Sequence, residues 1–264
     1  MEDFKWLRER VNDEEILLLF TAVGDDLRRA VGYVMERASR RSSVENTLIE
    51  LLEQAVDEGV DDTEGSVWIA LILGELQSRR AVPVLLRALA CEDETLAEAA
   101  VDAIQRIGEP AFDAVMEALE ETQSLEFELA CYRALQGAGA WEHPYLLQEV
   151  KDFLLDRLSR RELHPTAYEN LALTLARLGE RRALDPIRTV LSEKFHNVNS
   201  ALQDAVEMLE ENEAGVPYGV TIPSWEERLE WITGESFRLK PPQQQEDSPG
   251  AGPKRRRPRR PFTA

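Results

Sequence analysis

Two tandem pairs of helical patterns lie between Val67 and Leu119 and constrain the fold more than any other stretch of the chain. The run Val67–Leu73 is apolar on nearly all sides, which indicates a helix buried between neighbours. A one-sided stripe from Ala81 to Leu89 follows, and the same order recurs across the break at Gly108-Glu109-Pro110. A repeating two-helix unit predicts an elongated array, because each unit buries its apolar face against the next.

The hairpin pattern continues toward the C-terminus. Further helix pairs are predicted at Leu125–Gln136 with Tyr145–Leu158 and at Thr166–Leu178 with Ala183–Phe195, before a last stripe from Val198 to Leu209. Repetition is also visible residue by residue: Leu73-Gly74-Glu75 followed by Arg79-Arg80-Ala81 parallels Leu178-Gly179-Glu180 followed by Arg181-Arg182-Ala183. In this alignment Gly74 and Gly179 are counterparts.

The chain divides into four parts. We expect residues 1–62 to form an N-terminal helical cap, 63–212 the repeat array, 213–239 a C-terminal capping segment and 240–264 a disordered basic tail rich in proline and arginine. The cap is predicted to contain four helices, at Glu2–Arg10, Asp13–Val23, Asp25–Arg40 and Val44–Glu58.

A short helix is predicted within the capping segment. Ser224 and Glu227 have the spacing of a capping box, in which each side chain bonds the other residue's backbone amide. The helix carries Trp225, Leu229 and Ile232, and we expect it to cover the last apolar face of the array.

Charge is divided unevenly along the 264 residues. The net charge is −19, yet residues 240–264 hold seven Lys and Arg against two acidic residues, so the body carries −24 and the tail +5. An acidic body repels phosphate backbones and anionic membranes, which leaves nucleic acid as a partner of the tail alone. The longest apolar run is too short to span a bilayer and the first residues do not resemble a signal peptide, so we expect a cytoplasmic protein that does not bind membranes.

The run Ala81-Val82-Pro83-Val84-Leu85-Leu86-Arg87-Ala88-Leu89 resembles the short HEAT-like repeats of the phycobilisome-lyase type. Residues 65–121 match best, and 124–212 resemble more divergent copies. The resemblance implies an all-α fold, a right-handed α-solenoid of HEAT-like hairpins of the armadillo type. It also leaves open a bilin-lyase-like subunit, although no bilin-binding motif is present.

Catalytic and metal-binding patterns are weak. The three histidines, His143, His164 and His196, stand near predicted helix ends, where a histidine caps or packs more often than it binds a metal. Acidic residues three and four apart, such as Glu117, Glu120 and Glu121, describe one solvated helix face. The cysteines, Cys91 and Cys131, are expected to pack as apolar groups. We therefore expect no enzyme activity, cofactor or metal.

The leading hypothesis is an interaction scaffold, monomeric or part of a hetero-complex, that binds a protein or peptide partner. In such solenoids the second helix of each hairpin lines the inner surface, and basic ends would then flank an acidic middle, which suits a partner of mixed charge. The candidate residues are Arg79, Arg80, Arg87, Glu117, Glu120, Glu121, Asp152, Asp156, Arg181, Arg182 and Arg188.

The alternative hypothesis assigns function to the tail. Its basic cluster resembles a nuclear-import signal and also suits nucleic-acid phosphates, so a nuclear location is an option if the source cell is eukaryotic. The residues are Lys254, Arg255, Arg256, Arg257, Arg259 and Arg260.

Overall fold

The computed structural model describes residues 13–58, 64–122, 124–141, 143–160, 163–219 and 221–233. Within these ranges the regular structure is entirely helical, which confirms the predicted all-α solenoid. The helices are α2 (Glu14–Thr21), α3 (Gly24–Arg40), α4 (Ser42–Glu58), α5 (Glu64–Glu75), α6 (Val82–Ala88), α7 (Glu94–Ile107), α8 (Glu109–Glu121), α9 (Leu125–Gln136), α10 (Pro144–Ser159), α11 (Pro165–Arg177), α12 (Leu184–Phe195), α13 (Ser200–Glu211) and α14 (Trp225–Thr233). Three short 3-10 helices join them, η1 (Arg79–Ala81), η2 (Gly137–Ala140) and η3 (Arg181–Ala183).

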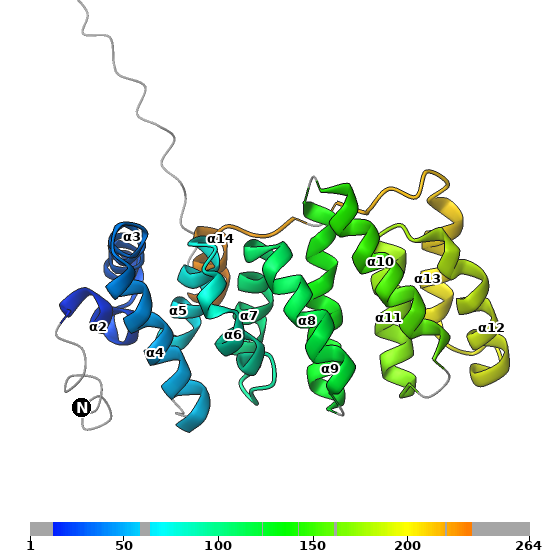
Figure 1. Ribbon diagram of the computed structural model, residues 1–264, viewed down its shortest axis with the longest axis horizontal. Helices are drawn as coiled ribbons and strands as arrows, with labels where there is room; N and C mark the ends of the chain where they lie inside the picture. The colour runs from blue at the N-terminus through cyan, green and yellow to red at the C-terminus, as the bar shows by residue number, and fades with distance from the viewer. Residues whose placement is uncertain are drawn as a thin grey trace, which may run out of the picture.

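The hairpins stack side by side along the long axis of the molecule (Figure 1). In each hairpin an odd-numbered first helix is followed by an even-numbered second helix, from α5 and α6 to α11 and α12. The predicted helix at Glu2–Arg10 and the basic tail lie outside the described residues. None of the described helices is long and apolar enough to cross a membrane.

The two copies of the Arg-Arg-Ala motif form the same turn. Each is a 3-10 helix between a first and a second helix, preceded by a residue with positive φ, Gln77 (φ 50) in one copy and Gly179 (φ 71) in the other. The equivalent of Gly179 is therefore Gln77, and the predicted pairing of Gly179 with Gly74 is wrong. The two glycines serve different purposes, since Gly179 ends a helix in a left-handed turn while Gly74 lies inside α5.

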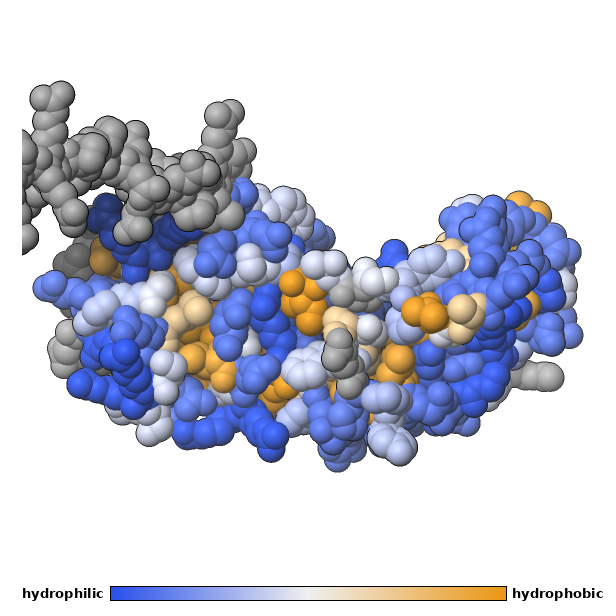
Figure 2. All heavy atoms as spheres, turned by 90° about the horizontal axis from the view of Figure 1, so that it is seen from above, coloured by the Kyte–Doolittle hydropathy of each residue, from blue (hydrophilic) through white to orange (hydrophobic). Residues whose placement is uncertain are grey.

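Small residues bring the first helices together. A Cβ atom on Gly74 would lie 2.6 Å from the Cα atom of Ala103 in α7. Helices α5 and α7 therefore approach so closely at this point that a side chain on residue 74 would clash with the α7 backbone. Contacts along the row of α5, α7, α9, α11 and α13 are accordingly denser than along the row of α4, α6, α8, α10 and α12. The inner row of a curved stack is the more crowded one, and Figure 2 shows a curved body with a hollow on one side. The first helices thus face the hollow, and the expectation that the second helices line the inner surface is wrong.

The segment after α13 reverses direction along the array. It runs back along one edge of the solenoid to α14, which lies beside α5 (Figure 1). Helix α14 packs against α3 and α5, and Arg228 reaches Asp102 of α7, which lies 126 positions away in the chain. The predicted capping box is confirmed, with Ser224 N to Glu227 Oε2 at 2.6 Å and Glu227 N to Ser224 Oγ at 3.2 Å. The expected position over the last helix of the array is wrong.

Candidate interaction surface

The charged residues predicted on the second helices pair mainly with neighbouring repeats. Arg87 of α6 contacts Asp57 of α4 at 2.5 Å, and Arg182 of η3 contacts Asp152 of α10 at 2.6 Å. Arg160 donates to both oxygens of Glu120 of α8, at 2.6 and 2.9 Å. These pairs join successive second helices, so much of the predicted surface stabilises the stack.

The remaining predicted residues fall into two groups. Four of them form hydrogen bonds or ion pairs within the chain: Arg80 donates to Asn46, Asp156 pairs with Arg160, Arg181 donates to the Glu213 carbonyl and Arg188 pairs with Glu210. Three others are exposed side chains of η1 and α8, namely Arg79, Glu117 and Glu121. The exposure of Glu117, Glu120 and Glu121 confirms the interpretation of one solvated helix face. The cluster Lys254 to Arg260 lies outside the described residues.

A groove of about 540 Å³ opens on the row of first helices. Its walls come from the loop after α6 and from α7, α9 and α11, and the helices place residues one or two turns apart along it. The lining residues are Leu89, Cys91, Glu92, Glu94, Ala97, Glu98, Glu126, Leu129, Arg133 and Asn170.

Acidic side chains dominate the polar part of this groove. Four carboxylates line it against one guanidinium, and Arg133 forms an ion pair with Glu98 across the α7–α9 boundary. Burial lowers the pKa of Arg133, while the charge of Glu94 opposes that change. Glu92, Glu94 and Glu126 are exposed at the rim, so the groove presents negative charge around an apolar floor that includes Leu89, Ala97 and Leu129.

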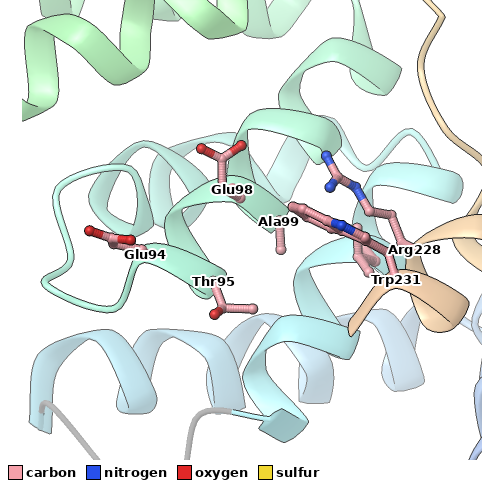
Figure 3. Close-up of a pocket in the computed structure, with 7 residues that line it drawn as sticks. Glu94, Thr95, Glu98, Ala99, Arg228 and Trp231 are labelled. Atoms are coloured by element: carbon pink, nitrogen blue, oxygen red, sulfur yellow. The ribbon is translucent and has the colours of Figure 1, made fainter. Parts of the chain in front are cut away.

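Helix α14 lies on the same face, next to this groove. Arg228 donates two hydrogen bonds to the carboxylate of Asp102, one from Nη2 to Oδ1 at 2.7 Å and one from Nε to Oδ2. The guanidinium also stacks on the ring of Trp231, with its central carbon 4.7 Å from the ring centroid, and Leu229, the residue after Arg228, is fully buried. Figure 3 shows Trp231 lying beside Ala99 of α7, with Glu98, Thr95 and Glu94 farther along that helix.

Asp102 is an unusual residue in its surroundings. Its side chain is 4% exposed, and its neighbours along α7 are mostly small and apolar. Burial raises the pKa of the Asp102 carboxyl, and the hydrogen bonds from Arg228 partly reverse that change. Burying a carboxylate is costly unless it is paired and hydrogen-bonded, and at Asp102 the guanidinium of Arg228 provides both.

A second buried polar cluster joins α9 to α10. Arg157 donates to the Tyr132 hydroxyl at 2.8 Å and to Glu128 at 2.8 Å, while Tyr132 donates to Glu128 at 2.6 Å. Burial and the hydrogen bond to Glu128 raise the pKa of Tyr132. Because the three side chains satisfy one another, the cluster holds two helices together and offers no group for acid or base chemistry.

The histidines cap helices, as predicted. Nδ1 of His143 accepts from the Leu146 amide at 3.2 Å, Nδ1 of His164 accepts from the Thr166 amide at 3.3 Å, and His196 ends α12 with a left-handed φ of 49°. Among the described residues no group of three or more His, Cys, Asp or Glu side chains has a geometry that could hold a metal ion. Cys131 is fully buried, which raises its pKa to about 12 and leaves the thiol protonated at neutral pH.

Sequence reasoning missed the groove and Asp102. One signal was available: Asp102 interrupts the otherwise small, apolar run from Ala99 to Ile104, and a charge at such a position calls for a partner. Nothing local indicated that the partner is Arg228, since the two residues meet only through the reversed course of the C-terminal segment.

Comparison with known proteins agrees with the stacked hairpins. The family model described as PBS lyase HEAT-like repeat matches residues 67–91, the stretch that contains most of α5 and all of α6. No curated protein matches the chain.

Among solved structures, one match is the crystal structure of an engineered protein from the Northeast Structural Genomics Consortium. It is 16% identical, covers 77% of this chain and 97% of its own, and superposes with a TM-score of 0.37, which is too low to establish a shared fold. Residues 67–91 thus match a HEAT-like repeat, and the stacked hairpins on both sides of it are those of a helical repeat solenoid.

Proposed function

We propose that the protein is a non-enzymatic interaction scaffold that binds a protein partner in the hollow formed by its first helices. The observation that carries this proposal is the groove between α7, α9 and α11, where an apolar floor is surrounded by Glu92, Glu94 and Glu126. A peptide or helix with basic residues flanking apolar ones complements such a surface in both charge and polarity.

Two features favour this face over the second helices. Many of the charges on the second helices already pair between repeats, whereas three groove carboxylates are exposed to solvent. In addition, this face already holds a helix of the same chain, α14, against α5 and α7. A surface that accommodates one amphipathic helix has the shape required for another.

The experiment is a titration of the full chain with a fluorescent peptide that alternates Lys and Leu, and with an acidic peptide of the same length. We expect the basic peptide alone to bind, with affinity falling as salt rises, because exposed charges are screened. The triple variant Glu92→Gln, Glu94→Gln, Glu126→Gln should lose at least tenfold in affinity for it.

The matched control is Asp113→Asn, Glu117→Gln, Glu121→Gln, which removes three exposed carboxylates from α8 instead. Equal losses in both variants would mean that only net charge attracts the peptide, and would contradict a site in the groove. Partners that co-purify from the source cells with the native chain but not with the groove variant are then the candidates for identification.

A further inference from the structure

The contact between α14 and the array has the features of a ligand seated in a binding site. One side chain, Leu229, is fully buried, and one charged side chain, Arg228, forms a two-point bond with the buried carboxylate of Asp102. Bidentate pairing of this kind is specific for arginine, because the planar guanidinium matches the two carboxylate oxygens. Where α14 packs against α3, α5 and α7, the array therefore accommodates an arginine followed directly by an apolar residue.

Net charge does not explain this docking. The nine residues of α14 include Glu226, Glu227 and Glu230 against a single arginine, so the helix is itself acidic and lies on an acidic body. Attraction must come from the one arginine pair and the apolar contact, both of which depend on position. Such a contact discriminates between sequences rather than collecting any helix of suitable charge.

The fit of α14 is incomplete. Trp231 remains 68% exposed although its ring lies beside α7, and a cavity of about 170 Å³ lies between it and Leu71, Thr95 and Ala99. A helix that placed its aromatic residue deeper would bury more apolar surface at the same site and would bind more tightly.

The connection to the array permits exchange. Between α13 and α14 the described residues, 212–219 and 221–224, form no regular helix, and Tyr218 donates hydrogen bonds to the carbonyls of Arg177 and Met208. A tether of this kind holds α14 near its site at an effective concentration of ~1 mM, which still allows the helix to leave.

We propose that the inner face of α5 and α7, centred on Asp102, is a docking site for a partner helix with the pattern Arg, apolar, any residue, aromatic, and that α14 is an internal ligand which such a partner displaces. This inference goes beyond the proposed groove, because it names a second site and the chemistry that the second site recognises. It predicts that binding of such a partner helix at Asp102 and docking of α14 at the same site exclude each other.

The test uses the full chain and a labelled peptide of residues 222–233. The wild-type chain should bind this peptide weakly, because its own α14 competes at millimolar effective concentration. The variant Arg228→Ala, Leu229→Ala releases α14 and should bind the peptide at least tenfold more tightly. Adding Asp102→Asn to that variant should abolish the gain, and a peptide with Lys in place of Arg228 should bind more weakly than the original.

Hydrogen exchange on the wild-type chain gives a measurement that needs no variant. Amides of α14 should exchange faster than those of α5 and α7, and excess peptide should accelerate exchange in α14 alone. Equal peptide affinities for the wild-type and released chains, or no effect of Asp102→Asn, would overturn the proposal. A wild-type dimer in light scattering that dissociates in the released variant would also overturn it, since α14 would then dock between copies.

The outcome is separable from that of the scaffold proposal. The double variant Glu92→Gln, Glu126→Gln changes two residues that line the groove but not the cavity beside α14, so it should bind the α14 peptide as the wild-type chain does. Loss of basic-peptide binding with α14 exchange preserved supports both proposals, whereas α14 exchange without any basic-peptide binding supports the Asp102 site alone.

Discussion

The two faces of the array use charge in opposite ways. On the second helices, arginines and carboxylates of successive repeats pair with each other, as in Arg87 with Asp57 and Arg160 with Glu120. On the first helices, small residues pack the array tightly, and the acidic side chains Glu92, Glu94 and Glu126 remain at the rim of a groove. The charges on the face of the second helices are thus largely paired within the chain, whereas the groove on the face of the first helices keeps exposed carboxylates.

The largest expected loss of stability comes from placing a charge among the buried apolar side chains between the helices, and it contrasts with a charge change on the exposed face of the second helices. Leu85→Asp and Leu119→Asp each place an unpaired carboxylate where the native side chain is fully buried, and should cost more than about 4 kcal/mol, enough to unfold the array. Arg87→Asp on α6 should lower stability by less than about 1 kcal/mol, because its ion pairs are exposed. Thermal unfolding followed by circular dichroism checks this, and similar melting of all three would refute the assigned helix faces.

A smaller effect tests the close approach of the first helices. Gly74→Ala introduces a methyl group 2.6 Å from the Ala103 backbone and should destabilise the fold by about 1–3 kcal/mol through overpacking. The control is Gly32→Ala in α3, where a new Cβ meets no atom within 4 Å and alanine should stabilise the helix by about 0.5–1 kcal/mol. Chemical denaturation should therefore give shifts of opposite sign. Two shifts of the same sign would contradict the role of Gly74 in the inner row.

A pH-dependent effect is expected at the turn before α12. The hydrogen bond from Arg182 holds the pKa of Glu180 below its usual value, so the folded state gains stability above the unfolded pKa and loses it as pH falls. Glu180→Gln should cost about 1 kcal/mol at pH 7, and the difference from wild type should shrink toward pH 3. Urea midpoints at several pH values measure this. A constant difference would mean that the carboxylate charge contributes nothing to the turn.

The smallest effect concerns a single pair on the outer face. Glu120→Gln removes one charge from the contact with Arg160, in which both side chains are about two-fifths exposed. The hydrogen bond from Arg160 lowers the pKa of Glu120, but solvent screening should keep the loss below about 0.5 kcal/mol. A loss of more than about 2 kcal/mol in a melting experiment would show that the outer pairs act as one cooperative network.

Local features were predictable because local interactions decide them. Helix α9 begins and ends at the predicted residues, the histidines cap helices, and Ser224 with Glu227 forms the predicted capping box. Each of these depends on groups within four positions of one another in the chain. The glycines of the repeats show the limit of local reasoning. Gly74 and Gly179 look equivalent in sequence, but Gly74 allows α5 to pack closely on α7, whereas Gly179 adopts the left-handed conformation of a turn.

The sequence by itself therefore determined the helices, their pairing into hairpins and the buried seam from Val67 to Leu119. Only the tertiary structure decided which row lies inside the curve, because this depends on how closely α5 and α7 approach relative to every other pair of helices. It also decided where α14 docks. Arg228 and Asp102 are 126 positions apart, and no local pattern encodes a contact that exists only after the whole array has formed.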